Sequence, residues 1–196
     1  MLTNSGNLQK QVTQGTLTSI LSACKVQLLP AEKNNSKTIQ SRTLANCLAN
    51  YLSEEGVATF VSNNLQMGNC NILIYISVGG IKFNNFALRY SCNPSLALAN
   101  SIQSYLWFKN LTVASIRYSI RQRDYELIRQ GILPLQVIFP GNPTDLAVSA
   151  ENYCHSIARA IAVFVHNTIH QNVVEVATPP PLLSVINPRR SVVTKP

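Results

Sequence analysis

The stretch 71–80 reads NILIYISVGG and decides the fold. Its apolar run is continuous and ends at Gly79-Gly80, which is typical of a strand buried on both faces. Strands of this kind belong to parallel sheets that helices cover on their faces. We therefore expect strands and helices to alternate on both sides of this stretch.

The flanking segments show that alternation. Before residue 71, the pattern predicts a strand over 25–29, a helix from 36 that ends at Gly56, and a strand over 57–61. After residue 80, it predicts a strand over 86–90, a helix starting at Asn93-Pro94, a strand over 133–139, and a long helix capped by Ser149. The fold class predicted is α/β, with a mainly parallel sheet flanked by helices.

Length and composition favour one globular domain. The chain has 196 residues, of which 46% are hydrophobic and 12% charged. The domain is expected over 25–172, after a polar amino-terminal arm over 1–24 and before a proline-rich basic tail over 173–196. No run of roughly 18 apolar residues occurs, which excludes a transmembrane helix.

The net charge of +8 makes an anionic partner plausible. Nucleic acid, an anionic envelope polymer and an anionic membrane would all be attracted by such a charge, and an ordinary basic surface would show it too. The best anion-binding candidates are four arginines close in sequence, namely Arg117, Arg121, Arg123 and Arg129. The alternative is that they belong to a solvated connection between a strand and a helix.

Five well-separated cysteines, without a CxxC pair, are typical of reduced and buried thiols. They predict a cytoplasmic protein. A competing interpretation is that residues 21–24, LSAC, form a lipobox that would make the chain an envelope lipoprotein through Cys24. The stretch before them is too polar for an export signal, and we therefore favour the cytoplasm.

Residue types that carry catalysis are scarce. The three histidines, His155, His166 and His170, lie on the last predicted helix, where 11 residues separate the first two by about 16 Å, too far to share a metal ion. His166 and His170 could chelate as a pair, although a polar stripe facing solvent explains them as well. No nucleophile elbow, Walker loop or GxGxxG motif occurs, and Gly79-Gly80 is only a weak phosphate cradle.

Several short segments match one family in order. Residues 25–34 look like a first strand of the type KIxIDPGHGG, and 71–80 like a strand that ends in IHxN. Residues 125–129, 133–134 and 142–145 are similar to the motifs YxVLR, MP and NPxD. Between about 25 and 170 the chain thus resembles the zinc-dependent N-acetylmuramoyl-L-alanine amidases of bacterial cell-wall turnover. The resemblance implies the fold of those enzymes, with peptidoglycan fragments as ligands.

At the matching positions the chain departs from the family. Glu32 stands at the first zinc-binding His, Ser36 or Lys37 at the zinc-binding Glu, and Val78 at the second His. The family's catalytic Glu falls in a stretch, 135–141, that contains no acid here. The resemblance therefore implies a vestigial cleft around Glu32, Ser36, Val78 and Gly79, with no metal, no cofactor and no catalytic residue.

Three functions remain open from the sequence. The leading hypothesis is a catalytically degenerate amidase-like domain that binds peptidoglycan fragments or an anionic wall polymer. The second is a basic nucleic-acid-binding or assembly protein, in which aromatic and cationic residues would stack on bases: Tyr105, Trp107, Phe108, Lys109, Arg117 and Tyr118. The third is a peptidoglycan hydrolase that uses residues other than those of the family. The sequence leaves the oligomeric state open.

Overall fold

A computed structural model of the chain describes residues 24–31, 36–66, 70–80, 85–111, 113–141 and 143–177. Its elements follow in the order β1 (Lys25–Pro30), α2 (Ser36–Glu54), β2 (Ala58–Val61), β3 (Ile72–Val78), β4 (Phe86–Tyr90), α3 (Asn93–Phe108), β5 (Val113–Tyr118), α4 (Gln122–Arg129), β6 (Leu133–Phe139) and α5 (Pro143–Ala177). The arm predicted over 1–24 and most of the tail predicted over 173–196 lie outside these ranges, so that division of the chain stays a prediction.

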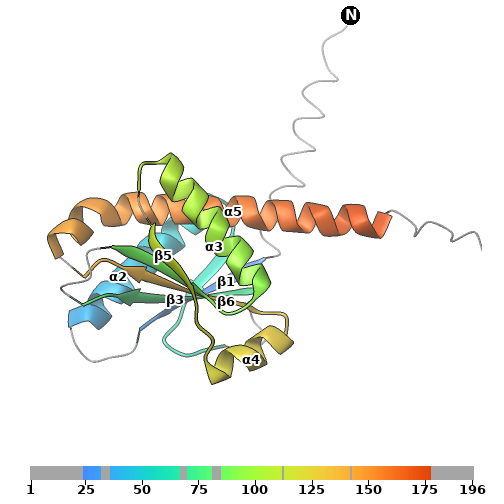
Figure 1. Cartoon of the computed structure of the whole chain (residues 1–196), viewed down its shortest axis with the longest axis horizontal. Helices are drawn as coiled ribbons and strands as arrows, with labels where there is room; N and C mark the ends of the chain where they lie inside the picture. Colours follow the sequence, from blue (N-terminus) through green and yellow to red (C-terminus); the bar gives the residue numbers. More distant parts are fainter. Residues whose placement is uncertain are drawn as a thin grey trace, which may run out of the picture.

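The six strands of these ranges form one sheet in the order β2-β1-β3-β6-β4-β5 (Figure 1). Strands β2, β1, β3 and β6 are parallel, whereas β4 runs antiparallel to β6 and parallel to β5. The central strand is β3, whose first five residues are buried. The predicted α/β fold with a mainly parallel sheet is confirmed.

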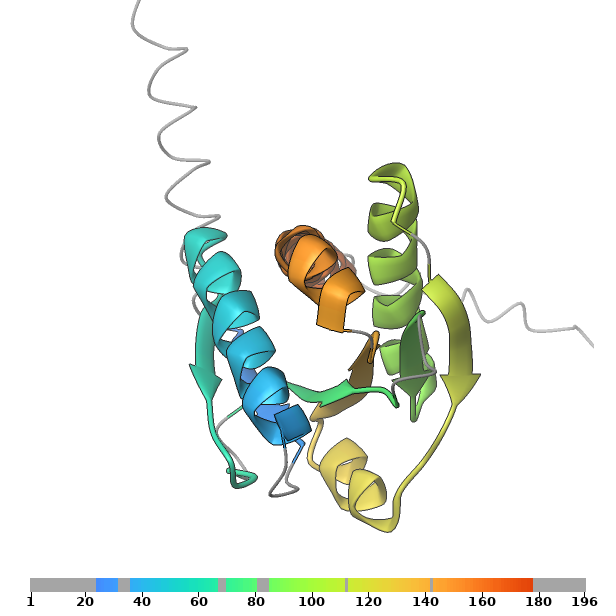
Figure 2. The ribbon, with the colours of Figure 1, turned by 90° about the vertical axis from the view of Figure 1, so that its left-hand side faces the viewer.

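Helices α2, α5 and α3 cover one face of the sheet, and α4 lies on the other (Figure 2). Because side chains alternate along a strand, Ile72, Ile74 and Ile76 of β3 point toward the three helices. There they meet the inner side of α5, which packs between α2 and α3 and contributes Ile157 and Ile161. This is the main hydrophobic core.

The opposite face, here called the open face, carries the intervening residues of the strands. A small apolar cluster there joins Leu29, Leu73 and Tyr75 to Leu127 of α4 and to Ile132. Among the described helices only α4 packs on this side, where it contacts β6. The same face also carries the polar side chains of Gln136, Arg89 and Arg117, which belong to the site described below or lie beside it.

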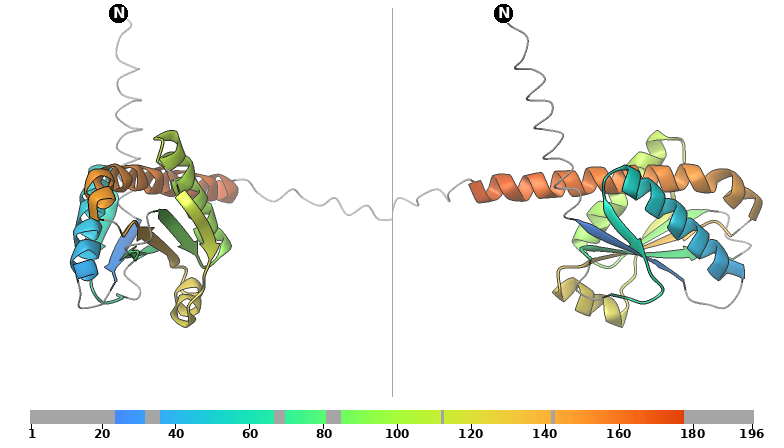
Figure 3. Two further views of the ribbon diagram at one scale, coloured as in Figure 1. Left: turned by 60° about the vertical axis from the view of Figure 1, so that its left-hand side comes forward. Right: turned by 180° about the vertical axis from the view of Figure 1, so that it is seen from behind.

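Three features differ from the sequence prediction. Strand β5 and helix α4 were not predicted, because β5 mixes polar with apolar residues and is half-exposed, and α4 carries several charges within eight residues. Helix α5 begins at Pro143, not at Ser149, and continues to Ala177 (Figure 3). Proline suits the first turn of a helix, where its missing N–H has no partner to lose.

None of the described helices is both long and apolar enough to cross a membrane. All five cysteines are free, and Cys24, Cys70 and Cys154 are buried.

Candidate functional site

A pocket of about 380 Å³ opens on the open face near the carboxyl ends of β1 and β3. We call it the Tyr75 pocket. Its walls come from β1, β3, β6, the loop after β2 and the start of α4, and they consist of Leu29, Pro30, Ala31, Asn63, Asn64, Leu65, Tyr75, Ile76, Ser77, Arg121, Arg123 and Gln136. The polar side chains in this set are those of Arg, Asn, Gln, Ser and Tyr, all of which can donate hydrogen bonds.

Two arginines of this wall converge on one aromatic ring. The guanidinium carbon of Arg121 lies 4.6 Å from the ring centre of Tyr75, and that of Arg123 lies 4.7 Å from it. A guanidinium is attracted to the electron-rich face of an aromatic ring, and this attraction gains strength when water is excluded. The start of α4 thus presents two positive charges together. We refer to Arg121 and Arg123 as the arginine pair.

Asp124 fixes the start of α4 against the sheet. Its carboxylate accepts hydrogen bonds from the hydroxyl of Tyr75 (3.2 Å), the hydroxyl of Ser91 (3.0 Å) and the backbone N–H of Arg121 (2.9 Å). Only 2% of Asp124 is exposed. Burial, together with the charge of Asp124, raises the pKa of Tyr75 to about 12, so its hydroxyl stays protonated and donates.

A line of hydrogen bonds continues from the arginine pair across the floor of the pocket. Arg121 donates from Nη2 to Oε1 of Gln136 at 2.7 Å, and Nε2 of Gln136 donates to Oγ of Ser77 at 3.1 Å. The hydroxyl of Ser77 in turn donates to the carbonyl of Val137. These contacts hold Arg121 in one position, whereas the side chain of Arg123 is exposed.

The wall opposite the arginine pair is also held in place. Gln27 is fully buried; its side-chain amide donates to the carbonyl of Asn64 at 2.8 Å and accepts from the N–H of Gln66 at 3.2 Å. Arg42 of α2 donates to the side chain of Asn63 at 2.6 Å. The loop after β2 therefore forms a fixed border of the pocket.

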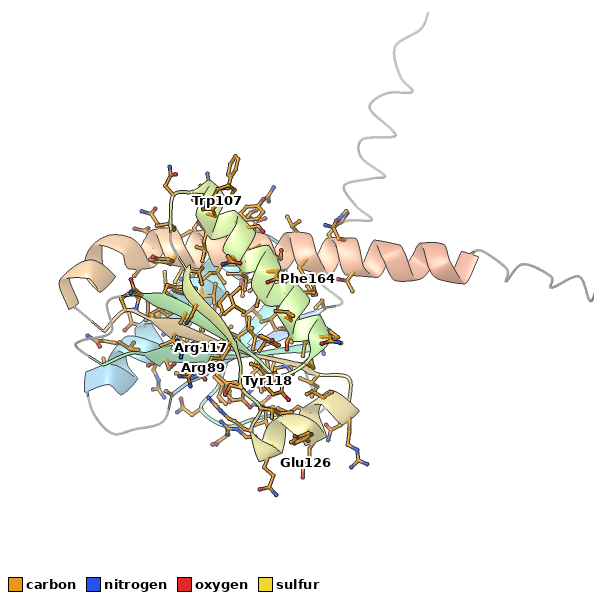
Figure 4. The ribbon with its side chains drawn as sticks, in the orientation of Figure 1. Arg89, Trp107, Arg117, Tyr118, Glu126 and Phe164 are labelled. Carbon is orange, nitrogen blue, oxygen red and sulfur yellow. The ribbon has the colours of Figure 1, made fainter. Side chains whose placement is uncertain are left out.

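Strand register places more arginines beside the pocket. Across the open face, Leu29, Tyr75, Gln136, Arg89 and Arg117 are neighbours in one row that crosses five strands. Arg89 and Arg117 are exposed and lie close together on β4 and β5 (Figure 4). We call these two residues the edge arginines. Like charges on adjacent strands repel each other, so their placement lowers stability unless an anion lies nearby.

The residues of the predicted vestigial cleft are only partly described. Glu32 lies outside the described residues, and Ser36 begins α2 with a side chain that is not described. Val78 ends β3 and is half-buried. Gly79 donates its N–H to the carbonyl of Phe139 at 2.9 Å, so this backbone donor is already used and does not face a ligand.

The described residues near this cleft do not suit a zinc ion. Val78 has no donor atom, and no three His, Cys, Asp or Glu side chains come together anywhere in the described ranges. Zinc in proteins needs three or four such ligands. Val78 instead packs against the main core, and it does not line the Tyr75 pocket.

The structure divides the four arginines that the sequence had grouped. Arg121 and Arg123 line the Tyr75 pocket, Arg117 lies on β5 beside Arg89, and Arg129 is exposed at the far end of α4. Sequence reasoning missed Tyr75, Ser77 and Gln136 as part of a site. The sequence marks these residues only weakly as part of a site, because Tyr75 stands within an apolar run and Gln136 becomes its neighbour only through the pairing of β3 with β6.

The histidines do not assemble into a site in the described part of the chain. His155 packs edge-on against the ring of Tyr51, with ring centres 5.2 Å apart. His166 lies 3.3 Å from the side chain of Asn167, and the side chain of His170 lies outside the described residues. The pairing of His166 with His170 therefore stays untested.

The aromatic and cationic residues proposed to stack on bases lie in two places. Trp107 and Phe108 are 79% and 80% exposed at the carboxyl end of α3, beside the exposed Lys109. Arg117 and Tyr118 end β5 and lie well away from Trp107 (Figure 4). These residues do not form one continuous surface.

Comparison with solved structures identifies the class of fold, which is that of the N-acetylmuramoyl-L-alanine amidases. AmiC2 of Nostoc punctiforme has a TM-score of 0.52 and 14% identity, over 75% of this chain and 97% of that one. The CwlD amidase of Clostridioides difficile, solved in complex with the GerS lipoprotein, has a TM-score of 0.52 and 13% identity, over 76% of this chain and 99% of that one.

The catalytic domain of the CD27L endolysin, which targets Clostridia difficile, also matches, with a TM-score of 0.52 and 17% identity over 74% of this chain and 97% of that one. No protein-family model matches the chain, and no curated protein matches it in sequence. At such identities the likeness shows the fold alone, and it confirms the amidase-like fold predicted from the ordered segments.

Proposed function

We propose that this chain is a catalytically degenerate amidase-like domain, a binding or structural module that recognises a peptidoglycan fragment or an anionic wall polymer without cleaving it. The observation that carries the proposal is the chemistry of the Tyr75 pocket. Its polar groups are two guanidinium groups, side-chain amides and hydroxyls, which bind anions. Amide hydrolysis by the zinc route requires a metal-bound water and a carboxylate base instead.

The hydrogen bonding of the pocket supports binding over catalysis. The hydroxyl of Ser77 donates to a backbone carbonyl and accepts from Gln136, so no general base holds its proton. The hydroxyl of Tyr75 donates to Asp124, which also accepts from Ser91 and Arg121. Burial and the charge of Asp124 raise the pKa of Tyr75 to about 12, so its hydroxyl stays protonated and is a weak nucleophile.

A direct test combines metal analysis with two assays on purified protein. Zinc content would be measured after purification and again after incubation with zinc, and muropeptides would be incubated with both samples to detect release of the stem peptide. Binding would be measured by sedimentation with insoluble peptidoglycan. We expect no stoichiometric zinc, no cleavage, and sedimentation that weakens in Arg123→Ala.

The matched control is Arg129→Ala, which removes the same charge from the far end of α4. Sedimentation of this variant should equal that of the unmodified protein. Stoichiometric zinc together with cleavage of muropeptides would overturn the proposal, and so would sedimentation that both variants lower equally.

Nucleic-acid binding is the second candidate, and the exposure of Trp107 and Phe108 favours it. Trp107 is the only tryptophan of the chain, so its fluorescence reports stacking directly. If this candidate holds, an oligothymidylate should quench that fluorescence, and its affinity should fall steeply between about 50 and 200 mM salt. Fluorescence that the oligonucleotide does not change would exclude it.

A further inference from the structure

Among the described residues, no carboxylate forms an ion pair with Arg121 or Arg123. Within the described ranges, the one ion pair joins Arg159 to Glu55, on the other side of the sheet. The nearby Asp124 is buried, and its two oxygens already accept three hydrogen bonds. Asp124 therefore reduces the local positive charge without occupying the donors of either guanidinium.

The side chain of Arg121 is held in one position in the absence of a ligand. Its guanidinium lies over the ring of Tyr75 and donates to Gln136, and its backbone N–H is held by Asp124. A side chain that is already fixed loses little conformational entropy on binding, which strengthens the interaction with a ligand. Arg123 lies over the same ring but stays exposed, so it can close on a bound group.

The edge arginines add to the same electrostatic field. Arg89 is the register neighbour of Gln136, to which Arg121 donates, and Arg117 is the neighbour of Arg89. Neighbouring strands are about 4.8 Å apart, so both edge arginines lie within about two strand spacings of the floor of the pocket. At physiological ionic strength this is close to one screening length, and the charges act together on an approaching anion.

We propose that the Tyr75 pocket binds the phosphate group of a small phosphorylated molecule, with the phosphate held by Arg121 and Arg123. A carboxylate carries one charge and is satisfied by one guanidinium. A phosphate monoester carries close to two charges and three acceptor oxygens, which matches a pocket lined by two guanidinium groups. This inference goes beyond the proposed function, because it adds a small phosphorylated molecule as a ligand of the same pocket.

The remaining walls fit the organic part of such a molecule. The pocket volume of about 380 Å³ exceeds what a phosphate group needs, and the fixed loop opposite the arginine pair offers Asn63 and Asn64. Amide side chains donate and accept hydrogen bonds, as sugar or peptide groups require. The ligand would therefore lie across the pocket, from the arginine pair to the loop after β2.

The test uses isothermal titration of the full chain with inorganic phosphate, inorganic pyrophosphate and succinate, all at one ionic strength. We expect one site per chain, and binding of pyrophosphate at least about tenfold tighter than that of succinate. Arg123→Ala should weaken pyrophosphate binding by about tenfold or more, since one charge-assisted contact is lost. Arg129→Ala should change it by less than about twofold, and a thermal melt of each variant verifies folding.

Three results would overturn the inference. Equal weakening by Arg123→Ala and Arg129→Ala would mean that pyrophosphate responds only to net charge. Succinate that binds as tightly as pyrophosphate would assign the pocket to carboxylates. An oligothymidylate that binds with the same loss in Arg123→Ala, while pyrophosphate does not bind, would assign the open face to nucleic acid.

These outcomes are separable from those of the proposed function. If pyrophosphate does not bind but peptidoglycan still sediments the protein, only the phosphate inference fails. If the zinc-loaded protein cleaves muropeptides, the proposed function fails, whatever the titration with pyrophosphate shows.

Discussion

The hydroxyl of Tyr75, in the central strand, donates a hydrogen bond of 3.2 Å to Oδ1 of Asp124, near the start of α4. This contact joins the sheet to the helix that carries the arginine pair. Asp124 also accepts from Ser91, which follows β4. One carboxylate thus ties three separate segments of the chain together beneath the pocket.

Replacement of Asp124 should therefore destabilise the fold. Asp124→Asn puts an NH₂ group where an acceptor stood, so at least one of the three donors loses its partner in a buried place. A buried donor without a partner costs about 1–3 kcal/mol. Urea denaturation should show a loss of this size in the free energy of unfolding.

The control for this measurement is Glu126→Gln, the same change of carboxylate to amide on the same helix. Glu126 is exposed and points away from the sheet (Figure 4). Its replacement should change stability by less than about 0.5 kcal/mol. Equal losses in the free energy of unfolding for both substitutions would show that Asp124 does not hold α4 against the sheet.

A second prediction concerns the close approach of the two chain segments that follow β3 and β6 in the sequence. Gly141 is buried, and a Cβ atom at this position would overlap the carbonyl oxygen of Gly80. Because the obstacle is backbone and not a flexible side chain, Gly141→Ala must displace one of the segments. We expect a loss of about 1–3 kcal/mol, measured as a lower midpoint of thermal unfolding.

Gly80→Ala provides the matched comparison. A Cβ added at Gly80 meets no atom within 4 Å. This variant should melt within about 2–4 °C of the unmodified protein, which corresponds to less than about 1 kcal/mol. A larger loss for Gly80→Ala than for Gly141→Ala would contradict the packing described for these segments.

The third prediction tests the aromatic cluster of the main core. The ring of Phe86 stacks on that of Tyr153 at 4.8 Å and meets that of Phe139 edge-on at 5.4 Å. Phe86→Leu keeps most of the volume but removes both ring contacts. We expect a loss of about 1–2 kcal/mol in chemical denaturation.

The same substitution at an exposed position serves as the reference. Phe108 is 80% exposed, so Phe108→Leu should leave the free energy of unfolding nearly unchanged. If Phe86→Leu proves equally harmless, the core tolerates loss of its rings and the stacking contributes little.

A pH dependence is expected for one thiol between α2 and α5. The neighbouring thiol of Cys154 lowers the pKa of the Cys47 thiol to about 7, although burial and the charge of Glu151 act in the opposite direction. Since the thiolate is the reactive form, alkylation of Cys47 by iodoacetamide should accelerate as the pH rises through about 7. Peptide mass spectrometry at a series of pH values would measure the rates.

Two comparisons establish the cause of this behaviour. Burial raises the pKa of Cys24 to about 11, so Cys24 should remain slow over the same pH range. In Cys154→Ala the neighbouring thiol is absent, and the inflection for Cys47 should move to higher pH. An inflection that stays near pH 7 in this variant would exclude Cys154 as its cause.

Patterns of hydrophobic residues predicted most of the sheet and its covering helices. Strand β3 was readable because both of its faces are buried, which makes its apolar run continuous. Strand β5 was not, because its residues, VASIRY, mix polar with apolar side chains and are half-exposed. The other edge strand, β2, was readable because its residues, ATFV, are mostly apolar.

The candidate site was less predictable than the fold, for a topological reason. Tyr75 and Gln136 become neighbours through pairing of β3 with β6, which are far apart in the sequence. Arg121 and Arg123 could be recognised as cations, but not as residues that share one ring. A sequence reports which residue types exist, whereas strand order decides which of them meet.

Helix α5 has a mechanical consequence for experiments on this protein. Its 35 residues correspond to a rod of about 52 Å, and its last turns project beyond the sheet (Figures 1 and 3). A rod fastened over only part of its length amplifies small rotations at its base. A spin label attached near Ala177 would therefore move by a measurable distance if α5 tilts slightly when a ligand binds in the Tyr75 pocket.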